Sequence, residues 1–170
     1  MFYKFVKGVI CIKIPLLALL FQGIPEQIAV TMLAFSIAQI SFNLKKVLTI
    51  SIIMAFSAYL ARLSQITFEI HTILLVIIFI LILLIVENVD LSLAFLSSLL
   101  SFLALAVFEY VVLSTLMPIF KLTPETVLSN LTIRILVGEP QVILMILVAL
   151  IIRQIRKRGK IYEFFGKCKS

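Results

Sequence analysis

The chain has 170 residues, of which 63% are apolar and 14% charged, and its net charge is +7. Soluble proteins are about 45–50% apolar and about 25% charged, so this composition excludes an ordinary soluble domain and indicates a lipid environment. Only five glycines and five prolines are present, which excludes collagen-like and disordered chains.

Apolar segments of membrane-spanning length occupy most of the chain. Crossing a bilayer takes about 20 helical residues, with about 17–25 as the working range. Lys13 and Pro15 interrupt the first segment, which is the weakest. The sequence predicts an all-α fold, a polytopic membrane helical bundle with about six transmembrane helices, at residues 5–21, 26–42, 47–61, 68–86, 91–117 and 140–155.

The pattern changes between the fifth and sixth segments. Pro118 is expected to end the fifth helix, and Thr123-Pro124-Glu125 has the composition of a new helix start. Residues 128–137 are mixed in polarity and too short to span, so they predict a short interfacial helix before the last span. Glu139-Pro140 then predicts the start of that span.

Small residues recur on one face of three predicted helices, a pattern typical of helix packing in membranes. The helix at residues 68–86 lacks such a face and is expected to contact lipid over much of its surface. Two of the three faces also include a charged residue, Arg62 or Glu109. The faces are Thr31, Ala34, Ala38 and Ser41; Ser51, Ala55, Ala58 and Arg62; and Ala94, Ser98, Ser101 and Glu109.

Basic residues predict the orientation in the membrane. Seven of the fifteen lie in the last eighteen positions, directly after an apolar segment, as the positive-inside rule expects at a cytoplasmic helix end. Six spans with a cytoplasmic N-terminus place Lys4, Lys7, Lys45 and Lys46 on the same side as this block. The prediction is one transmembrane domain (residues 1–155) and a basic cytoplasmic tail (residues 156–170). The chain is then a multi-pass protein of the plasma membrane, with both termini in the cytoplasm.

Motifs for catalysis, cofactors or metals do not stand out in the sequence. It has no glycine-rich phosphate loop, zinc-protease motif or nucleophile elbow, and His71 is the only histidine. Cys11 and Cys168 match no metal or redox spacing. We therefore expect no enzyme activity, no cofactor and no metal. The basic block lacks interleaved aromatic residues, so we expect the lipid bilayer as partner, with a membrane protein as a second candidate, and no nucleic acid.

Charged or titratable residues near the outer membrane face form the candidate site. Placing a charge at the centre of the hydrocarbon costs about 2.5–3.5 kcal/mol, so such residues often mark function. The sequence predicts a cluster in which Arg62 approaches Glu109 or Glu69, with both helix faces turned inward to floor a pocket. Ordinary snorkelling, or a pair that only fixes helix register, is the alternative. The candidate ligand-binding or structural residues are Arg62, Glu69, His71, Glu109 and Arg134.

Two stretches carry a resemblance to a known family. They are Ala-Arg-Leu-Ser-Gln-Ile-Thr-Phe-Glu-Ile-His-Thr at residues 61–72 and Arg-Ile-Leu-Val-Gly-Glu-Pro at residues 134–140. Together with the long apolar helix after the first, they resemble the membrane-embedded sensor half of Gram-positive sensor histidine kinases of the peptide-quorum type, or small stand-alone relatives. The resemblance implies signal transduction at a bacterial plasma membrane. Since only fifteen residues follow Ile155, we expect no kinase domains.

Two functional hypotheses of different classes follow. The main one is a non-enzymatic integral membrane protein with a sensing or partner-binding role. The alternative is the substrate-binding membrane subunit of a vitamin-type transporter, to which the chain is similar in length and helix number. Such a subunit would dock through small-residue faces such as that of Ala34 and Ala38.

Overall fold

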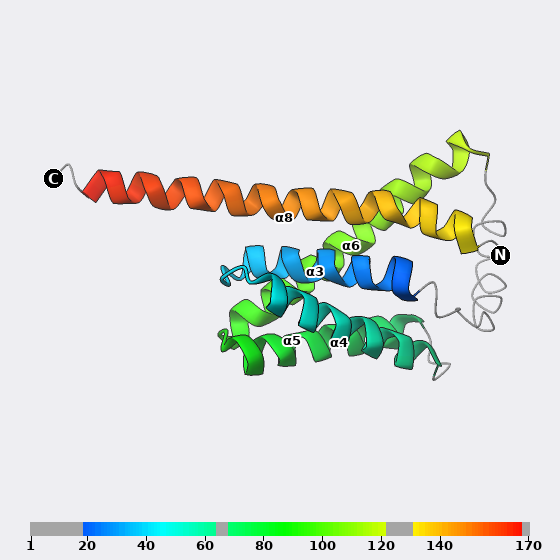
Figure 1. Ribbon diagram of the computed structural model, residues 1–170, viewed down its shortest axis with the longest axis horizontal. Helices are drawn as coiled ribbons and strands as arrows, with labels where there is room; N and C mark the ends of the chain where they lie inside the picture. The colour runs from blue at the N-terminus through cyan, green and yellow to red at the C-terminus, as the bar shows by residue number, and fades with distance from the viewer. Residues whose placement is uncertain (1–18, 64–67, 122–130, 168–170) are drawn as a thin grey trace.

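The computed structural model describes residues 19–63, 68–121 and 131–167, which are helical apart from short connections (Figure 1). No strand occurs within these ranges, which confirms the predicted all-α class. The elements are a π-helical turn η1 (Leu19–Gly23) and the helices α3 (Ile24–Ile37), α4 (Leu44–Leu63), α5 (Phe68–Glu87), α6 (Leu91–Ile119) and α8 (Leu131–Lys167).

Four helices, α4, α5, α6 and α8, contain stretches long and apolar enough to cross a membrane, so the chain is a multi-pass helical membrane protein. The sequence predicts about six spans. Its second span, residues 26–42, is helical only as α3, which has 14 residues. Its first span, residues 5–21, lies mostly outside the described residues, and the part that is described belongs to η1.

The helices run between two ends of the bundle. At the end we call the basic end, α4 begins with Lys45 and Lys46, and α8 carries Arg153 and Arg156. The opposite end contains Leu63, where α4 ends, and Lys121, which follows the end of α6 at Ile119. Helices α3 and α8 run in the same direction, because Gln22 lies against Gly138 at the opposite end and Arg156 reaches the last residues of α3 at the basic end.

Helix α3 forms the centre of the bundle. It contacts α4, α6 and α8, while α5 packs against α4 and α6 (Figure 1). Ala29, Val30, Ala34 and Phe35 on α3 are completely buried. Helices on several sides therefore bury the small and large apolar side chains of α3.

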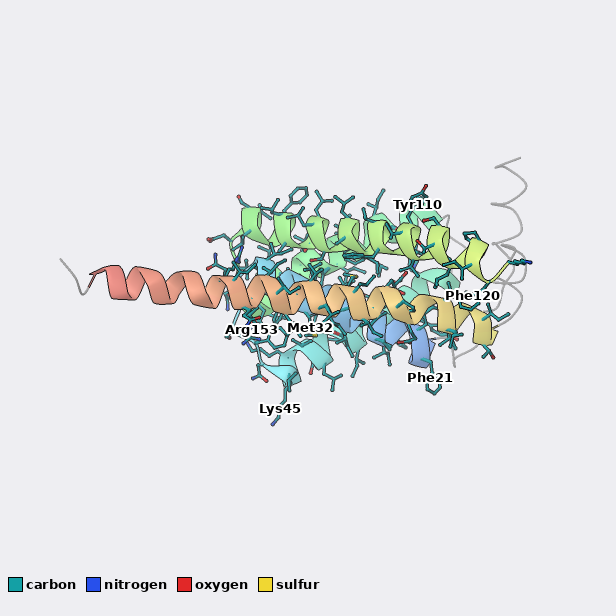
Figure 2. The ribbon with its side chains drawn as sticks, turned by 90° about the horizontal axis from the view of Figure 1, so that it is seen from above. Phe21, Met32, Lys45, Tyr110, Phe120 and Arg153 are labelled. Atoms are coloured by element: carbon teal, nitrogen blue, oxygen red, sulfur yellow. The ribbon has the colours of Figure 1, made fainter. Side chains whose placement is uncertain are left out.

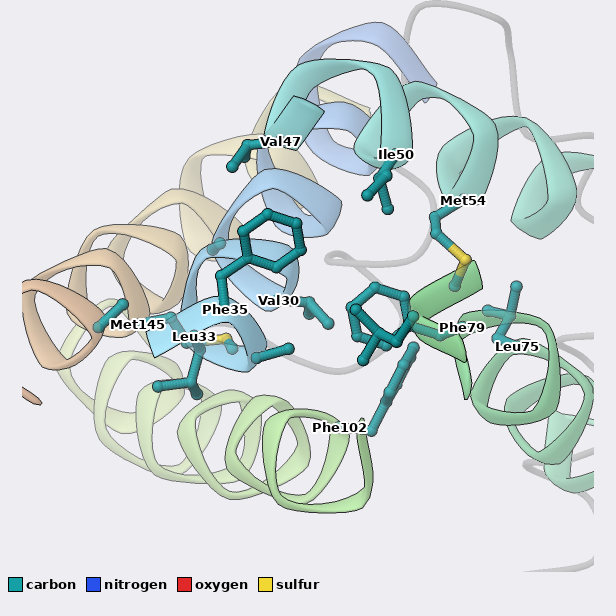
Figure 3. Close-up of a cluster of buried hydrophobic side chains, with 14 of the residues drawn as sticks. Val30, Leu33, Phe35, Val47, Ile50, Met54, Leu75, Phe79, Phe102 and Met145 are labelled. Carbon is teal, nitrogen blue, oxygen red and sulfur yellow. The ribbon is translucent and has the colours of Figure 1, made fainter. Parts of the chain in front are cut away.

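A second part of the core joins α4, α5 and α6. The rings of Phe79 on α5 and Phe102 on α6 meet edge to face, with centroids 6.0 Å apart and planes at 75° (Figure 3). Met54 from α4 and Leu75 from α5 belong to the same buried cluster. Because the edge of one aromatic ring is electropositive and the face of the other electronegative, this arrangement is favourable beyond its contact area.

Most small residues of the predicted packing faces are buried in the bundle, although Ser41 is exposed. Ser51, Ala55 and Ala58 on α4 are buried, as are Ala94, Ser98 and Ser101 on α6. By contrast, α5 is the least buried of the four candidate spans, as its lack of small residues predicts. Small side chains allow helix backbones to approach closely, and this is the role they take here.

Replacing Ala55 by Leu should destabilise the bundle by about 1–3 kcal/mol, because three extra carbon atoms would enter a filled interface. Ala55 is 2% exposed, whereas Ile77 on α5 is 49% exposed. Ile77→Leu is the matched control and should leave stability nearly unchanged. Thermal aggregation in detergent compares the two, and equal losses would contradict the assignment of the packing face.

The end of α3 is a turn closed by a residue in the left-handed conformation. Gln39 has φ 59°, and the Ile40 amide donates to the Phe35 carbonyl at 3.0 Å. This bond defines a Schellman motif, in which glycine is the usual left-handed residue. The motif ends the helix well short of residue 42, where the apolar pattern predicts the end.

Gln39→Gly should stabilise the protein by about 0.5–1 kcal/mol, because glycine adopts a positive φ without the steric cost of a Cβ. The preceding residue supplies the control, since Ala38 has a helical φ of −75°. Ala38→Gly should instead destabilise, through the greater freedom of the unfolded chain. Thermal unfolding in detergent measures both. A loss of stability in Gln39→Gly would contradict the strain argument.

The prediction of an interfacial helix separate from the last span is wrong. A single helix, α8, includes residues 131–137 and the predicted last span, with Pro140 inside it. Proline removes one backbone hydrogen bond, but buried Val137, Gly138, Gln141 and Val142 lie on both sides of it. Membrane helices tolerate proline because neighbouring helices, side chains and local backbone adjustments satisfy the freed backbone groups. Pro118 likewise lies within α6, which ends at Ile119.

Helix α8 also continues past the basic end of the bundle to Lys167 (Figure 1). The segment from residue 156, which the sequence predicts as a basic tail, is therefore helical as far as Lys167. The first turns of this segment carry a run of basic residues, Arg156, Lys157, Arg158 and Lys160.

Candidate functional site

The predicted outer cluster lies at the opposite end of the bundle. Arg62 is in the last turn of α4, Glu69 in the first turn of α5 and Arg134 in the first turn of α8. The side chains of these three residues lie outside the described part of the structure. Their helices place all three residues at the same end of the bundle, and their pairing stays a prediction.

His71 is the member of this cluster whose contacts are defined. Its side chain is buried, and its Nε2 lies 3.1 Å from the backbone carbonyl oxygen of Ala58. A carbonyl oxygen can only accept, so the imidazole Nε2 carries the proton in this bond. The bond joins the start of α5 to the last turns of α4 and holds the α4–α5 corner together.

Glu109 does not have the inward orientation that the sequence predicts. Its side chain is exposed, whereas Ala94, Ser98 and Ser101 on the same helix are buried. Glu109 lies about 80° around the helix from Ser101, which is enough to bring it to the edge of the buried face. The inward turn expected for Glu109 is therefore wrong, although its depth in the bundle matches that of Arg62.

A charge swap tests the predicted pair of Arg62 and Glu109. Each is 18 residues from the first residue of its helix at the basic end, about 27 Å along the axis. Arg62→Glu and Glu109→Arg should each reduce the yield of folded protein, and the double swap should restore it. Size-exclusion profiles in detergent measure the yield. Additive losses in the double variant would mean that the two charges do not interact.

Polar side chains buried between α3 and α4 form a second cluster. The Ser51 hydroxyl lies 2.7 Å from the Val47 carbonyl and 3.2 Å from both the Gln27 carbonyl and the Thr31 hydroxyl. Thr31 in turn donates to the Gln27 carbonyl at 2.8 Å. The contacts of Ser51 with the Gln27 carbonyl and the Thr31 hydroxyl link α4 to α3. Since these two contacts join neighbouring helices, they contribute to helix association.

Two arginines on α8 contact the corner between α3 and α4, and the sequence did not predict this. Arg156 donates from Nη1 to the carbonyl oxygens of Ser36 at 2.9 Å and Ile37 at 2.6 Å. The Arg153 guanidinium carbon lies 4.2 Å from the centroid of the Phe42 ring. Carbonyls at a helix C-terminus lack intrahelical partners and carry partial negative charge, so Arg156 caps α3 from another helix.

The same end contains an ion pair. Lys46 Nζ lies 2.9 Å from Glu87 Oε2, joining the start of α4 to the end of α5. The Glu87 side chain is only 4% exposed, whereas that of Lys46 is 44% exposed. The sequence analysis did not predict this pair. The signal that could have found it is that Lys46 and Glu87 both lie at helix ends on the same side of the bundle.

Comparison with known proteins finds no relative. No protein-family model matches the chain, and no curated protein or solved structure matches it. The described residues contain no group of three or more His, Cys, Asp or Glu side chains arranged to hold a metal ion.

Proposed function

We propose that the protein is a non-enzymatic, six-span integral protein of the plasma membrane with a sensing or partner-binding role, and that both termini are cytoplasmic. The observation that carries the proposal is the course of α8. This helix begins at the end that holds the predicted polar cluster, follows α3 through the bundle and projects beyond the basic end (Figure 1). One rigid element thus connects the two sides of the membrane.

Contacts at both ends of α3 support such a connection. At the opposite end, a Cβ on Gly138 would lie 3.1 Å from Gln22 Nε2, so α8 approaches the start of the α3 region closely. At the basic end, Arg156 binds the last carbonyls of α3. A displacement of α8 along its axis would change both contacts, so a ligand that shifts α8 at one end would alter the projecting helix at the other.

The distribution of charge supports the orientation. Among the described side chains, the basic end has Lys45, Lys46, Arg153 and Arg156 against Glu87 and Asp90. The opposite end has Lys121 against Glu26, Glu109 and Glu139. The positive-inside rule places the basic end in the cytoplasm.

The distance that α3 and η1 cover across the bundle supports counting α3 as a membrane span. The contacts at Gly138 and Arg156 bracket 18 residues of α8, about 27 Å along its axis, close to the thickness of the hydrocarbon core. Helix α3 and η1 cover the same depth together. Lys4 and Lys7 favour a cytoplasmic N-terminus, which adds a sixth span before η1.

The transporter-subunit alternative loses its main support. It requires the face of Ala34 and Ala38 for docking to partner subunits, but both residues are buried inside the bundle by the chain's own helices. Because the chain's own helices occupy this face, it does not support docking to partner subunits, and we propose the sensing or partner-binding role.

Co-purification from native membranes tests this role. A partner-binding protein should bring down a stoichiometric membrane or cytoplasmic partner, and a chain truncated after Arg156 should lose it because the projecting part of α8 is gone. A chain truncated after Lys167 is the control and should keep the partner. Recovery of transporter ATPases would contradict the proposal, and so would the absence of any stoichiometric partner.

A further inference from the structure

Three cations lie at the connection between α3 and α4, and no described carboxylate pairs with them. Arg153 lies on the Phe42 ring, Arg156 binds the α3 carbonyls, and Lys45 projects from the start of α4 (Figure 2). None of these three side chains forms an ion pair with a described acidic residue. Arg156 uses one terminal nitrogen for both carbonyl bonds. Its remaining donors are available to a ligand.

Nearby acidic residues do not balance this charge. Glu87 is paired with Lys46, and its side chain is almost completely buried. Asp90 is the other acidic residue at this end whose side chain the structure describes. The sequence adds Lys157, Arg158 and Lys160 on the next turns of α8. The basic end therefore carries an excess of positive charge near the connection at residues 38–43.

Exposed apolar residues precede two of these cations in the chain. Leu44 immediately precedes Lys45 and is 75% exposed, and Ile155 immediately precedes Arg156 and is 64% exposed. A free phosphate ion would use only the cations. A phospholipid would use both features, since its headgroup is anionic and its acyl chains are apolar.

We propose that the basic end binds the headgroup of an anionic phospholipid at the surface formed by Lys45, Arg153 and Arg156, with its acyl chains against Leu44 and Ile155. Guanidinium and ammonium groups form strong, charge-assisted hydrogen bonds to phosphate oxygens. The bound lipid would sit beside the cap that Arg156 places on α3 and add to the attachment of α8. This inference is independent of what the protein senses.

Lipid binding in competition measures the proposed surface. The full-length protein in detergent is titrated with phosphatidylglycerol in an excess of phosphatidylcholine, and lipid adducts are counted by native mass spectrometry. Lys45→Gln should weaken phosphatidylglycerol binding about fivefold, the factor expected for one cation near a lipid surface. Arg153→Gln should weaken it by a similar factor, whereas Lys45→Arg should bind like the unchanged protein.

Lys121→Gln is the matched control, because Lys121 is an exposed cation at the opposite end of the bundle. It should leave phosphatidylglycerol binding unchanged. An equal loss in this variant, or equal binding of both lipids to the unchanged protein, would overturn the proposal. Displacement of the lipid by millimolar inorganic phosphate would also overturn it, since a site for free anions alone would then suffice. Helicity and size-exclusion profiles show whether each variant is folded.

Discussion

Phe79→Ala should lower the free energy of unfolding by about 3 kcal/mol, the largest loss expected from a single substitution in the bundle. The Phe79 side chain is completely buried, and its ring packs edge to face on Phe102 (Figure 3). Removing the ring leaves a cavity between α5 and α6 and abolishes the aromatic contact. In a membrane, packing contacts of this kind are a main source of helix association.

Leu81→Ala provides the control two residues further along the same helix. Leu81 is 49% exposed, so its side chain contacts lipid in the folded protein and in separated helices alike. Its loss should change stability by less than about 1 kcal/mol. Unfolding of both variants by a denaturing detergent, followed by circular dichroism, measures the difference. Similar losses in the two variants would contradict the assignment of Phe79 to the core.

A reporter enzyme that is active only outside the cytoplasm should be inactive when fused after Ser170 and active when fused after Lys121. The basic end of the bundle carries the excess of cations and should stay in the cytoplasm, while Lys121 follows α6 at the opposite end. Because the proposed orientation puts the two fusion sites on opposite sides of the membrane, the expected change is complete, from no activity to full activity.

A second reporter that is active only in the cytoplasm should give the reverse pattern and guards against fusions that fail to fold. A third fusion, placed before Met1, distinguishes five spans from six, since a cytoplasmic N-terminus requires an additional span before η1. Activity of the first reporter after Ser170 would overturn the proposed orientation.

The fold class and most helix positions were predictable because apolar length is a strong signal. The predicted span at residues 68–86 agrees with α5 to within one residue, since acidic and turn-forming residues follow it. The break after α3 was not predictable in the same way. Gln39 adopts the left-handed conformation without the glycine that usually marks it, and the apolar pattern continues through the turn to Phe42.

Proline misled the prediction around α8 for a related reason. Pro140 has the local chemistry of a helix start, yet the helix passes through it because its buried face packs on α3. The local sequence shows that proline removes a backbone hydrogen bond from the helix. Whether the helix continues depends on its tertiary contacts, which the local sequence does not show. The same limit applies to Pro118 near the end of α6.

The sequence predicted how far along their helices the candidate residues lie, but not which helix face they occupy. Helix lengths place Arg62 and Glu109 at one level, but a small error in angle is enough to move Glu109 from the buried face to the exposed one. The contacts of Arg156 were missed because they join residues far apart in the chain, and the positive-inside rule already accounts for a basic residue at that position.

The cap on α3 has a consequence for how the protein is made. The carbonyls of Ser36 and Ile37 receive hydrogen bonds from a residue 120 and 119 positions later in the chain. During synthesis, the ribosome must therefore finish nearly the whole polypeptide before these bonds can form. Until then, the central helix is inserted with its last carbonyls uncapped by Arg156, so chains released early would expose this end to membrane proteases that remove incomplete products.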